Sequence, residues 1–281
     1  MNGGRDNTVI GRIAAAVAVA LIAVVNLLPV LWGVATSFKP DQEILAPQPR
    51  LWGFDATTMH YDTVISGNFG QAFVTSLGYG VLSMALAVLL ASVTAYALDR
   101  LRFRFRQVVF YVIVACVPLS IGAAILVVPT YIYFTALGLG NQWFTLPMVY
   151  LALNLPLATW VMKGAVEAVP TELDQAAKLD GLASLGILFR VILPLCRPGI
   201  FAAGMLVFVG AWSEFLAGTV LVQSASLRPV QVAIYTYITS FGRAWGPLTA
   251  AAILAVLPIL VLLFILGRHM VSGLARGSVK G

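Results

Sequence analysis

The residues with the clearest capacity for chemistry form one polar stretch between two long apolar runs. Residues 172–181 read ELDQAAKLDG, in a chain of which only 10% is charged. Thr171 with Asp174 matches a T-x-x-D capping box, and acidic residues in a first turn complement the positive end of the helix dipole. Gly181 suits the left-handed conformation in which many helices end. The spacing therefore predicts a short helix over this stretch.

The predicted helix offers a surface for a protein partner. Leu173, Ala176 and Ala177 share one face at i, i+3, i+4 spacing. Small side chains let a partner backbone approach closely, and charges around them can orient that partner, so the helix suits a groove in another protein. A solvated helical loop is the alternative that the pattern leaves open. A second short helix is expected from Ser184, closed by Pro194.

A second group of polar residues falls inside apolar runs. Glu214 lies in an expected membrane helix beside Trp212 and Ser213, and a carboxylate inside a bilayer is costly unless it is paired or faces water. Contact with a solute, a hydrogen bond to a neighbouring helix and a constraint on a partner subunit are the roles that this pattern allows. Asn154 and Ser120 are weaker candidates for the same solute pathway.

Other kinds of chemistry are disfavoured by what the sequence lacks. It has no G-x-x-x-x-G-K-[ST] loop to hold ATP phosphates. Its two histidines, His60 and His269, fall in loops expected on opposite sides of the membrane, which disfavours a histidine-based triad. Cys116 and Cys196 lack metal-ligand spacing. Since Glu214 is the only clear ionisable group inside an expected span, the energy for any transport is expected from another chain.

The elements that must position these residues are membrane helices. The chain has 281 residues, is 60% hydrophobic and has a mean hydropathy of +0.94, far above a soluble domain. A spanning helix needs about 20 mostly apolar residues. The runs of this length predict an all-α, polytopic membrane protein with six transmembrane helices, near 12–37, 72–98, 107–134, 143–166, 199–221 and 246–268.

The positions of lysine and arginine predict which side each loop occupies. All but four of the 17 basic residues fall at the termini or in the loops after the second and fourth expected helices; the exceptions are Lys39, Arg50, Arg228 and Arg243. Both termini are therefore expected in the cytoplasm. This asymmetry accounts for the net charge of +6, so no nucleic-acid partner is expected.

Residues 172–194 closely resemble the EAA loop of membrane subunits of bacterial binding-protein-dependent ABC importers. That motif reads Glu-Ala-Ala, three residues, Gly, nine residues, Ile, one residue and Leu-Pro. This chain keeps every spacing, and the matching residues are Gln175, Ala176, Ala177, Gly181, Val191, Leu193 and Pro194. Valine for isoleucine is a mild change. Gln175, however, lacks the charge of the usual glutamate, which puts any salt bridge at that place in doubt.

Further segments resemble the carbohydrate (maltose permease G-like) branch of this family, in the same order along the chain. They are TSFKP after the first expected helix, AYALDRLRF (95–103), VPTYIYFTALGLGN (128–141), AWSEFL (211–216) and the tail GLARGSVKG (273–281). The resemblance implies a type I ABC importer permease fold. It would form one transmembrane domain over 1–281, with a core of about 72–270 and the EAA loop at 169–199.

The resemblance also implies partners and site residues. The chain would be half of a pore in the bacterial inner membrane, with a homologous second permease, two ATPase subunits and an extracytoplasmic solute-binding protein. It would be no enzyme and hold no cofactor, because the ATPases bind ATP and Mg. The EAA loop would form a coupling helix seated in an ATPase cleft, and the residues implied are Glu172, Leu173, Gln175, Ala176, Ala177, Asp180, Gly181, Leu193 and Pro194.

Two outer loops complete the expectation. Residues 38–71 and 222–245 are expected to contact the solute-binding protein, whereas Tyr235, Tyr237 and Trp245 suit an interfacial aromatic belt. The expected cargo is a sugar or sugar derivative, and a polyol or glycerol phosphate is left open. A stand-alone secondary carrier and an integral-membrane enzyme are the competing classes. An enzyme would need acids or histidines clustered at one membrane depth, and the sequence shows no such cluster.

Overall fold

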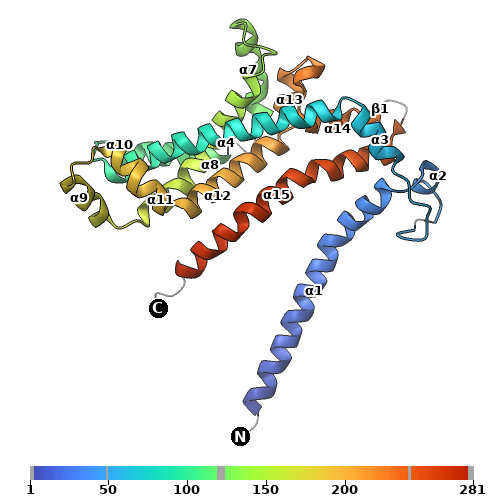
Figure 1. Ribbon diagram of the computed structural model, residues 1–281, viewed down its shortest axis with the longest axis horizontal. Helices are drawn as coiled ribbons and strands as arrows, with labels where there is room; N and C mark the ends of the chain where they lie inside the picture. Colours follow the sequence, from blue (N-terminus) through green and yellow to red (C-terminus); the bar gives the residue numbers. More distant parts are fainter. Residues whose placement is uncertain (1–2, 49, 119–123, 240–241, 278–281) are drawn as a thin grey trace. The chain divides into compact units, whose positions relative to one another are not determined.

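The computed structural model describes residues 3–48, 50–118, 124–239 and 242–277, and these residues are mostly helical (Figure 1). The α-helices are α1 (Gly3–Ser37), α2 (Asp41–Ile44), α3 (Met59–Ser66), α4 (Phe69–Arg100), α5 (Arg106–Ala115), α7 (Ala124–Ala136), α8 (Thr145–Glu167), α9 (Thr171–Leu179), α10 (Ser184–Ile187), α11 (Leu193–Leu195), α12 (Arg197–Ser213), α13 (Leu216–Leu221), α14 (Val230–Tyr235) and α15 (Trp245–Gly277). A π-helical turn, η1 (Leu188–Ile192), and a 3₁₀ turn, η2 (Ala225–Leu227), accompany them. The strands β1 (Ile238–Thr239) and β2 (Gly242–Arg243) pair antiparallel.

Four of the described helices are long and apolar enough to cross a membrane. They are Gly11–Ser37 within α1, α4, α8, and Trp245–Gly267 within α15, and they match the first, second, fourth and sixth expected spans. A fifth candidate is a bent pair, Ser184–Leu195 followed by Arg197–Ser213, whose halves meet at 85°. Of the third expected span, 107–134, the structure describes α5 and α7. The six-helix count therefore stays a prediction.

The fifth expected helix, 199–221, is not continuous. α12 ends at Ser213, Glu214 has an extended backbone (φ −74°, ψ 122°), and α13 begins at Leu216. The prediction of one uninterrupted helix is wrong because the Glu214 carboxylate binds the first backbone N–H groups of α13 and so stabilises a new helix start. Apolar composition alone does not reveal such a break.

The chain divides into two compact units. Unit 1 is Met1–Gly67 with Ile234–Leu254, and unit 2 is Asn68–Ala233 with Ala255–Gly281. In unit 1 the buried ring of His60 donates from Nε2 to the carbonyl oxygen of Lys39 at 2.7 Å. Gly246 leaves room for this ring, since a Cβ there would lie 2.2 Å from Cε1 of His60. These contacts fasten α3 to the end of α1 and to the first turn of α15.

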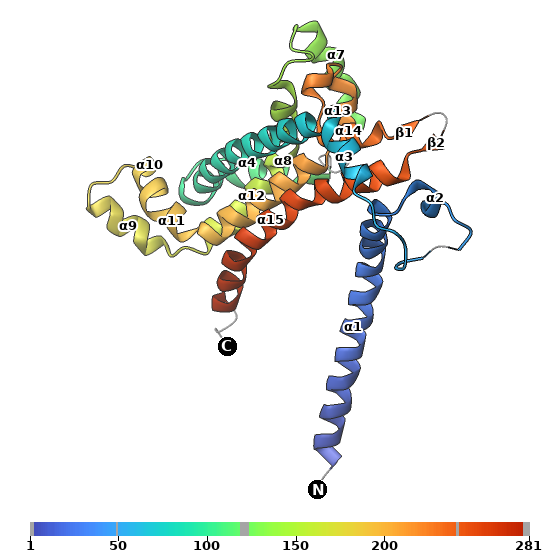
Figure 2. The same cartoon turned by 45° about the vertical axis from the view of Figure 1, so that its right-hand side comes forward.

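Unit 2 is built around α4, α8 and α12, which pack side by side (Figures 1 and 2). Ala87, Ala91 and Ala95 are fully buried along one stripe of α4, at a spacing of four residues. Small residues on such a stripe let neighbouring helix backbones approach closely. Met162 and Val166 of α8 belong to the same core. This close-packed bundle is the scaffold that carries the polar segment at its end.

Candidate functional site

The polar segment at 172–181 forms α9, at the end of the bundle where α4 and α8 finish (Figure 2). The helix follows Pro170, whose extended backbone (φ −57°, ψ 135°) precedes the first turn. It ends before Gly181, which has the expected left-handed conformation at φ +81°. The proposed capping box is wrong, because Thr171 lies inside the helix and Asp174 pairs with an arginine instead.

The inner face of α9 belongs to the chain's own core. Asp174 and Ala177 are buried, and Ala177 lies in one cluster with Ile187 of the following helix. The expectation that Leu173, Ala176 and Ala177 form a single partner-facing surface is therefore wrong for Ala177. Burial of Asp174, three residues earlier on the same side, turns Ala177 inward as well.

The outer face of α9 is exposed and mixes apolar with polar side chains. Its exposed residues and those of the turn after it are Thr171, Glu172, Leu173, Gln175, Ala176, Lys178, Leu179, Asp180 and Gly181. Leu179 is 89% exposed, although it was not among the expected site residues. The i, i+3, i+6 spacing from Leu173 through Ala176 could have identified it. Of the last two expected residues, Leu193 is half-buried against the core and Pro194 is exposed.

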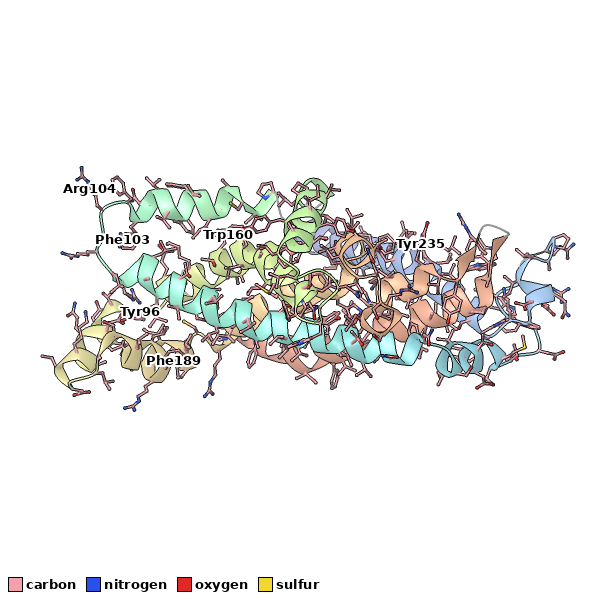
Figure 3. The ribbon with its side chains drawn as sticks, turned by 90° about the horizontal axis from the view of Figure 1, so that it is seen from above. Tyr96, Phe103, Arg104, Trp160, Phe189 and Tyr235 are labelled. Atoms are coloured by element: carbon pink, nitrogen blue, oxygen red, sulfur yellow. The ribbon has the colours of Figure 1, made fainter. Side chains whose placement is uncertain are left out.

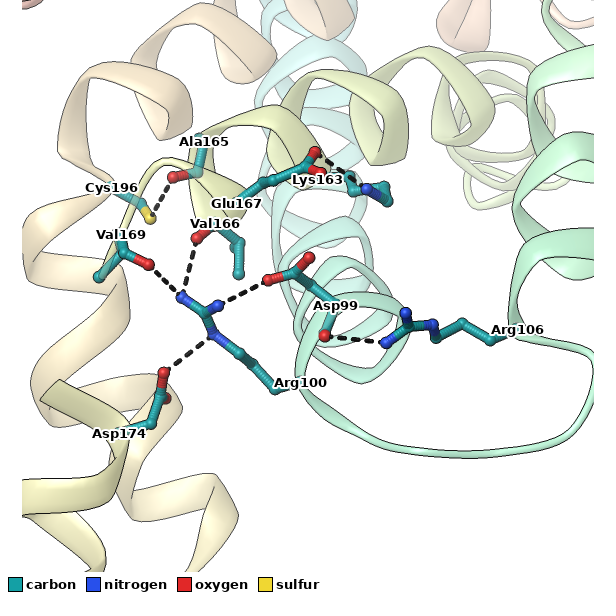
Figure 4. Close-up of polar contacts among 10 residues, drawn as sticks. All are labelled: Asp99, Arg100, Arg106, Lys163, Ala165, Val166, Glu167, Val169, Asp174 and Cys196. Carbon is teal, nitrogen blue, oxygen red and sulfur yellow. Dashed lines mark hydrogen bonds and ion pairs between the residues drawn. The ribbon is translucent and has the colours of Figure 1, made fainter. Parts of the chain in front are cut away.

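Arg100, the last residue of α4, holds α9 in this orientation (Figure 4). Its Nε lies 2.9 Å from Oδ2 of Asp174, and its Nη1 lies 2.9 Å from Oδ2 of Asp99. The Asp174 contact is poorly aligned for a hydrogen bond and acts as an ion pair. Nη2 donates to the carbonyl oxygens of Val166, at 3.1 Å, and Val169. One guanidinium thus joins the ends of α4 and α8 to α9.

This arginine cluster is enclosed by protein. The side chains of Arg100 and Asp174 are only 9% and 7% exposed. Arginine suits such a site because its planar fork stays charged and presents several donors in fixed directions. Sequence reasoning missed Arg100, since an arginine at the end of a span is expected from topology alone. Its partner Asp174 lies far away in the sequence, and no local spacing links the two.

A second close contact joins the base of α12 to α8, beside the arginine cluster (Figure 4). The thiol of Cys196 donates to the carbonyl oxygen of Ala165 at 3.3 Å. A Cβ at Gly199 would lie 2.3 Å from the Cβ of Ala165, so only glycine fits here without a shift of the helices. The start of α12 is therefore fixed against the same part of α8 that binds Arg100.

Glu214 lies at the break between α12 and α13, where its carboxylate caps α13. Oε1 accepts from the N–H groups of Leu216 and Ala217 at 3.1 Å, and Oε2 accepts from Ala217 at 2.9 Å and Gly218 at 3.4 Å. A carboxylate at this place also complements the helix dipole. The geometry therefore supplies Glu214 with a structural role in its own chain. Of the three roles expected from the sequence, a hydrogen bond to a neighbouring helix is the nearest to it.

The other expected pathway residues that the structure describes lie near this break: Trp212 and Ser213 precede Glu214 directly, and Asn154 lies against Gly210 of α12, where a Cβ would be 2.2 Å from its Oδ1. Trp212 is buried, stacks on Phe208 with ring centroids 5.6 Å apart, and donates from Nε1 to the Ala255 carbonyl at 3.0 Å. Asn154 donates to the Tyr150 carbonyl of its own helix at 2.8 Å. Ser213 is exposed at the end of α12. Ser120 lies outside the described residues.

The charged groups described above connect helix ends to one another. Among the residues that the structure describes, no group of three or more His, Cys, Asp or Glu side chains could hold a metal ion. The polar contacts instead tie helix ends together, at Arg100 and at Glu214. Both sites place charged groups where one helix ends and another begins.

Known proteins match this chain over most of its length. The family model for the binding-protein-dependent transport system inner membrane component matches residues 87–276. The sulfoquinovosyl glycerol transport system permease protein of Agrobacterium fabrum is 34% identical, over 94% of this chain and 93% of that protein. The trehalose transport system permease protein of Mycobacterium tuberculosis is also 34% identical, over 91% and 93%.

A solved structure shares the fold. It is a bacterial ABC transporter involved in the import of the acidic polysaccharide alginate, which matches with a TM-score of 0.79 at 19% identity, over 94% of this chain and 98% of that one. The family match confirms a membrane transport component in place of an enzyme, and it confirms the inner membrane as the location. This chain belongs to the family of binding-protein-dependent transport system inner membrane components.

Proposed function

We propose that this chain is the pore-forming permease subunit of an ATP-driven importer of a sugar or sugar derivative. The names of two relatives support this cargo class, because one transports sulfoquinovosyl glycerol and the other trehalose. The structural neighbour takes part in the import of a polysaccharide. A polyol or glycerol phosphate is the alternative cargo, and a separate solute-binding protein would make most of the selection.

The observation that carries the proposal is the orientation of α9. On its inner face Asp174 forms an ion pair with Arg100, while its outer face presents Leu173, Ala176 and Leu179 to solvent. An exposed apolar stripe on a short helix is the surface that a partner groove would cover. We propose that an ATPase subunit binds this face, with Glu172, Gln175, Asp180 and Gly181 at its rim and with Ala177, Leu193 and Pro194 as support. Gln175 would contribute a hydrogen bond where the motif usually has a charge.

The proposed assembly contains this chain, a homologous second permease, two ATPase subunits and an extracytoplasmic solute-binding protein. ATP and Mg would bind in the ATPases, whose closure would move α9. A ligand shifts an equilibrium only through different affinities for its two states. ATP would supply that difference, and the helix bundle would switch between inward-facing and outward-facing arrangements.

We further propose six spans in a single transmembrane domain with both termini in the cytoplasm. The ion pair between Arg100 and Asp174 supports one part of this topology, because it puts α9 on the same side as the basic loop after α4. That side would be the cytoplasm, where arginine-rich loops are favoured. We propose that Ser213 and Glu214, at the helix break, line the solute path. Trp212 and Asn154 would support these residues, and Ser120 is a further candidate.

Cysteine cross-linking within the assembled importer tests the docking face. In a background with Cys116→Ser and Cys196→Ser, we expect Leu179→Cys to form a cross-link to the ATPase. Ala177→Cys is the matched control, since it lies on the same helix but faces the core. Cross-linking at Ala177 without cross-linking at Leu179 would contradict the orientation, and no cross-link from Leu179 would remove the docking proposal.

Solute binding tests the cargo class separately. The solute-binding protein that works with this permease should bind a disaccharide or a glycosyl glycerol in calorimetric titration. It should show much weaker binding of simple polyols and glycerol phosphate. A preference for either of these latter compounds would replace the sugar assignment and leave the coupling proposal in place.

A further inference from the structure

The loop between α4 and α5 combines positive charge with exposed aromatic rings. Residues 100–106 read RLRFRFR, so that every second residue is an arginine and each residue between them is apolar. The side chains of Phe103 and Phe105 are 45% and 63% exposed. Figure 3 shows Phe103 and Arg104 at the end of the bundle, with Arg104 extending away from the helices. Exposed aromatic rings beside exposed charges suit a partner that offers both an apolar and an anionic part.

The arginines of this loop differ in their partners. Arg100 is compensated by Asp99 and Asp174, and Arg106 donates to the Asp99 carbonyl oxygen at 3.2 Å. Arg102 and Arg104 are exposed, and neither forms an ion pair within the described part of the chain. The guanidinium carbon of Arg104 lies 5.5 Å from the ring centroid of Phe105, which is a cation–π contact. This contact orients the guanidinium group but does not neutralise its charge.

The depth of the loop identifies the kind of partner. The apolar span α4 ends at Arg100 and the apolar helix α5 begins at Arg106, so the residues between them lie at the membrane surface. Phenylalanine rings can enter the acyl boundary there while arginine heads reach the phosphates. Phe103, Arg104 and Phe105 also line a shallow cavity of about 270 Å³, together with the first turn of α5.

We propose that residues 101–106 form a binding surface for anionic phospholipid headgroups of the phosphatidylglycerol type. Arg102 and Arg104 bind the phosphodiester through the guanidinium fork, and Phe103 and Phe105 insert beside the acyl chains. A zwitterionic lipid offers the same phosphate but adds a positive group that repels both arginines. The surface therefore selects for net negative charge. This inference rests on the membrane location of the chain and not on the coupling proposal.

Quenching by brominated lipids tests this surface in the complete importer. Phe105→Trp places a reporter in the loop and keeps an aromatic ring there, and quenching is compared between dibromo-phosphatidylglycerol and dibromo-phosphatidylcholine in mixed vesicles. A basic residue near an anionic surface contributes about 1 kcal/mol, which corresponds to about fivefold in binding. We therefore expect Arg102→Gln with Arg104→Gln to lower the preference for phosphatidylglycerol by about 25-fold, so that quenching by phosphatidylglycerol falls and quenching by phosphatidylcholine rises.

Two comparisons keep the test decisive. Arg197→Gln removes one positive charge from an exposed position at the start of α12 and should change the preference by less than about twofold. If the double variant does not assemble, the reporter protein itself should lose most of its preference between about 0.1 and 1 M salt, since salt screens exposed charges. The proposal would be overturned if the double variant kept its preference for phosphatidylglycerol, or if Arg197→Gln lost as much of that preference. It would also be overturned if the double variant released the ATPase while its lipid preference stayed intact.

Discussion

Replacing Arg100 should separate ATP hydrolysis from transport. Arg100→Met keeps much of the apolar stem but removes the guanidinium. The carboxylates of Asp99 and Asp174 and the carbonyl oxygens of Val166 and Val169 then lose their shared partner. Removal of one partner from a buried ion pair costs about 3–5 kcal/mol, because the remaining charge stays out of water.

Asp174→Asn should cost less than Arg100→Met, because it leaves more of the cluster intact. Arg100 keeps its ion pair with Asp99 and both carbonyl contacts, so its charge stays compensated and the loss stays below the about 3–5 kcal/mol expected for an unpaired buried charge. A factor of ten corresponds to about 1.4 kcal/mol. Local opening of α9 should therefore increase less than about 100-fold with Asp174→Asn and more than about 100-fold with Arg100→Met.

Hydrogen exchange of the assembled importer measures this opening. The amides of α9 should lose protection in both variants, whereas those of α12 should keep theirs, which separates release of α9 from global unfolding. Uptake per ATP hydrolysed should fall in the same order, since a released helix transmits less movement. Purely structural damage would instead lower hydrolysis and uptake together.

The Lys163–Glu167 pair of α8 supplies the matched control. Its Nζ and Oε2 atoms are 3.0 Å apart at i, i+4 spacing, but the Glu167 side chain is 62% exposed. Such a pair is worth about 0.3–0.5 kcal/mol, so Glu167→Gln should change exchange by less than about threefold. The reasoning fails if Arg100→Met affects α9 exchange no more than this control does, or if uptake per ATP is the same in all three variants.

Three further changes test other contacts. Gly199→Val should destabilise the base of α12 by about 1–3 kcal/mol, since its Cβ would overlap Ala165, and thermal unfolding in detergent measures this. Glu214→Ala should cost about 1–2 kcal/mol through loss of the α13 cap, with Glu214→Gln closer to the parent protein in the same assay. Ala176→Trp should abolish uptake, because it places a large side chain on the proposed docking face. The chain alone should keep its thermal stability, because Ala176 is exposed.

The spans could be predicted from the sequence because a bilayer imposes a length and a composition on each helix. The expected helix 143–166 differs from α8 by only a residue or two at each end. Gly181 was equally predictable, since its left-handed conformation at φ +81° is one that other residues rarely adopt. Features of this kind depend on a residue's own conformation or on a run of neighbours, and both are visible in one sequence.

The failures have a different origin. Ala177 matched a partner-facing stripe by periodicity, but the inner and outer sides of α9 are decided by the ion pair of Asp174 with Arg100. Glu214 was placed within a helix by apolar composition, although its carboxylate stabilises a break. In both cases one charged side chain overrides a pattern of many apolar ones, because a buried charge without a partner costs several kcal/mol.

Arg100 links two surfaces whose functions would otherwise be unrelated. Its side chain forms an ion pair with Asp174 of α9, the proposed contact to the ATPase. Its backbone begins the loop that we propose to bind anionic lipid. Movement of α9 must therefore either stretch a buried ion pair or carry the end of α4 with it. Movement of the end of α4 together with α9 costs less, because separating Arg100 from Asp174 would leave the buried Asp174 carboxylate without its partner. On both proposals, lipid bound to the same loop would resist or assist this movement, and the end of α4 would be the point where the membrane influences coupling.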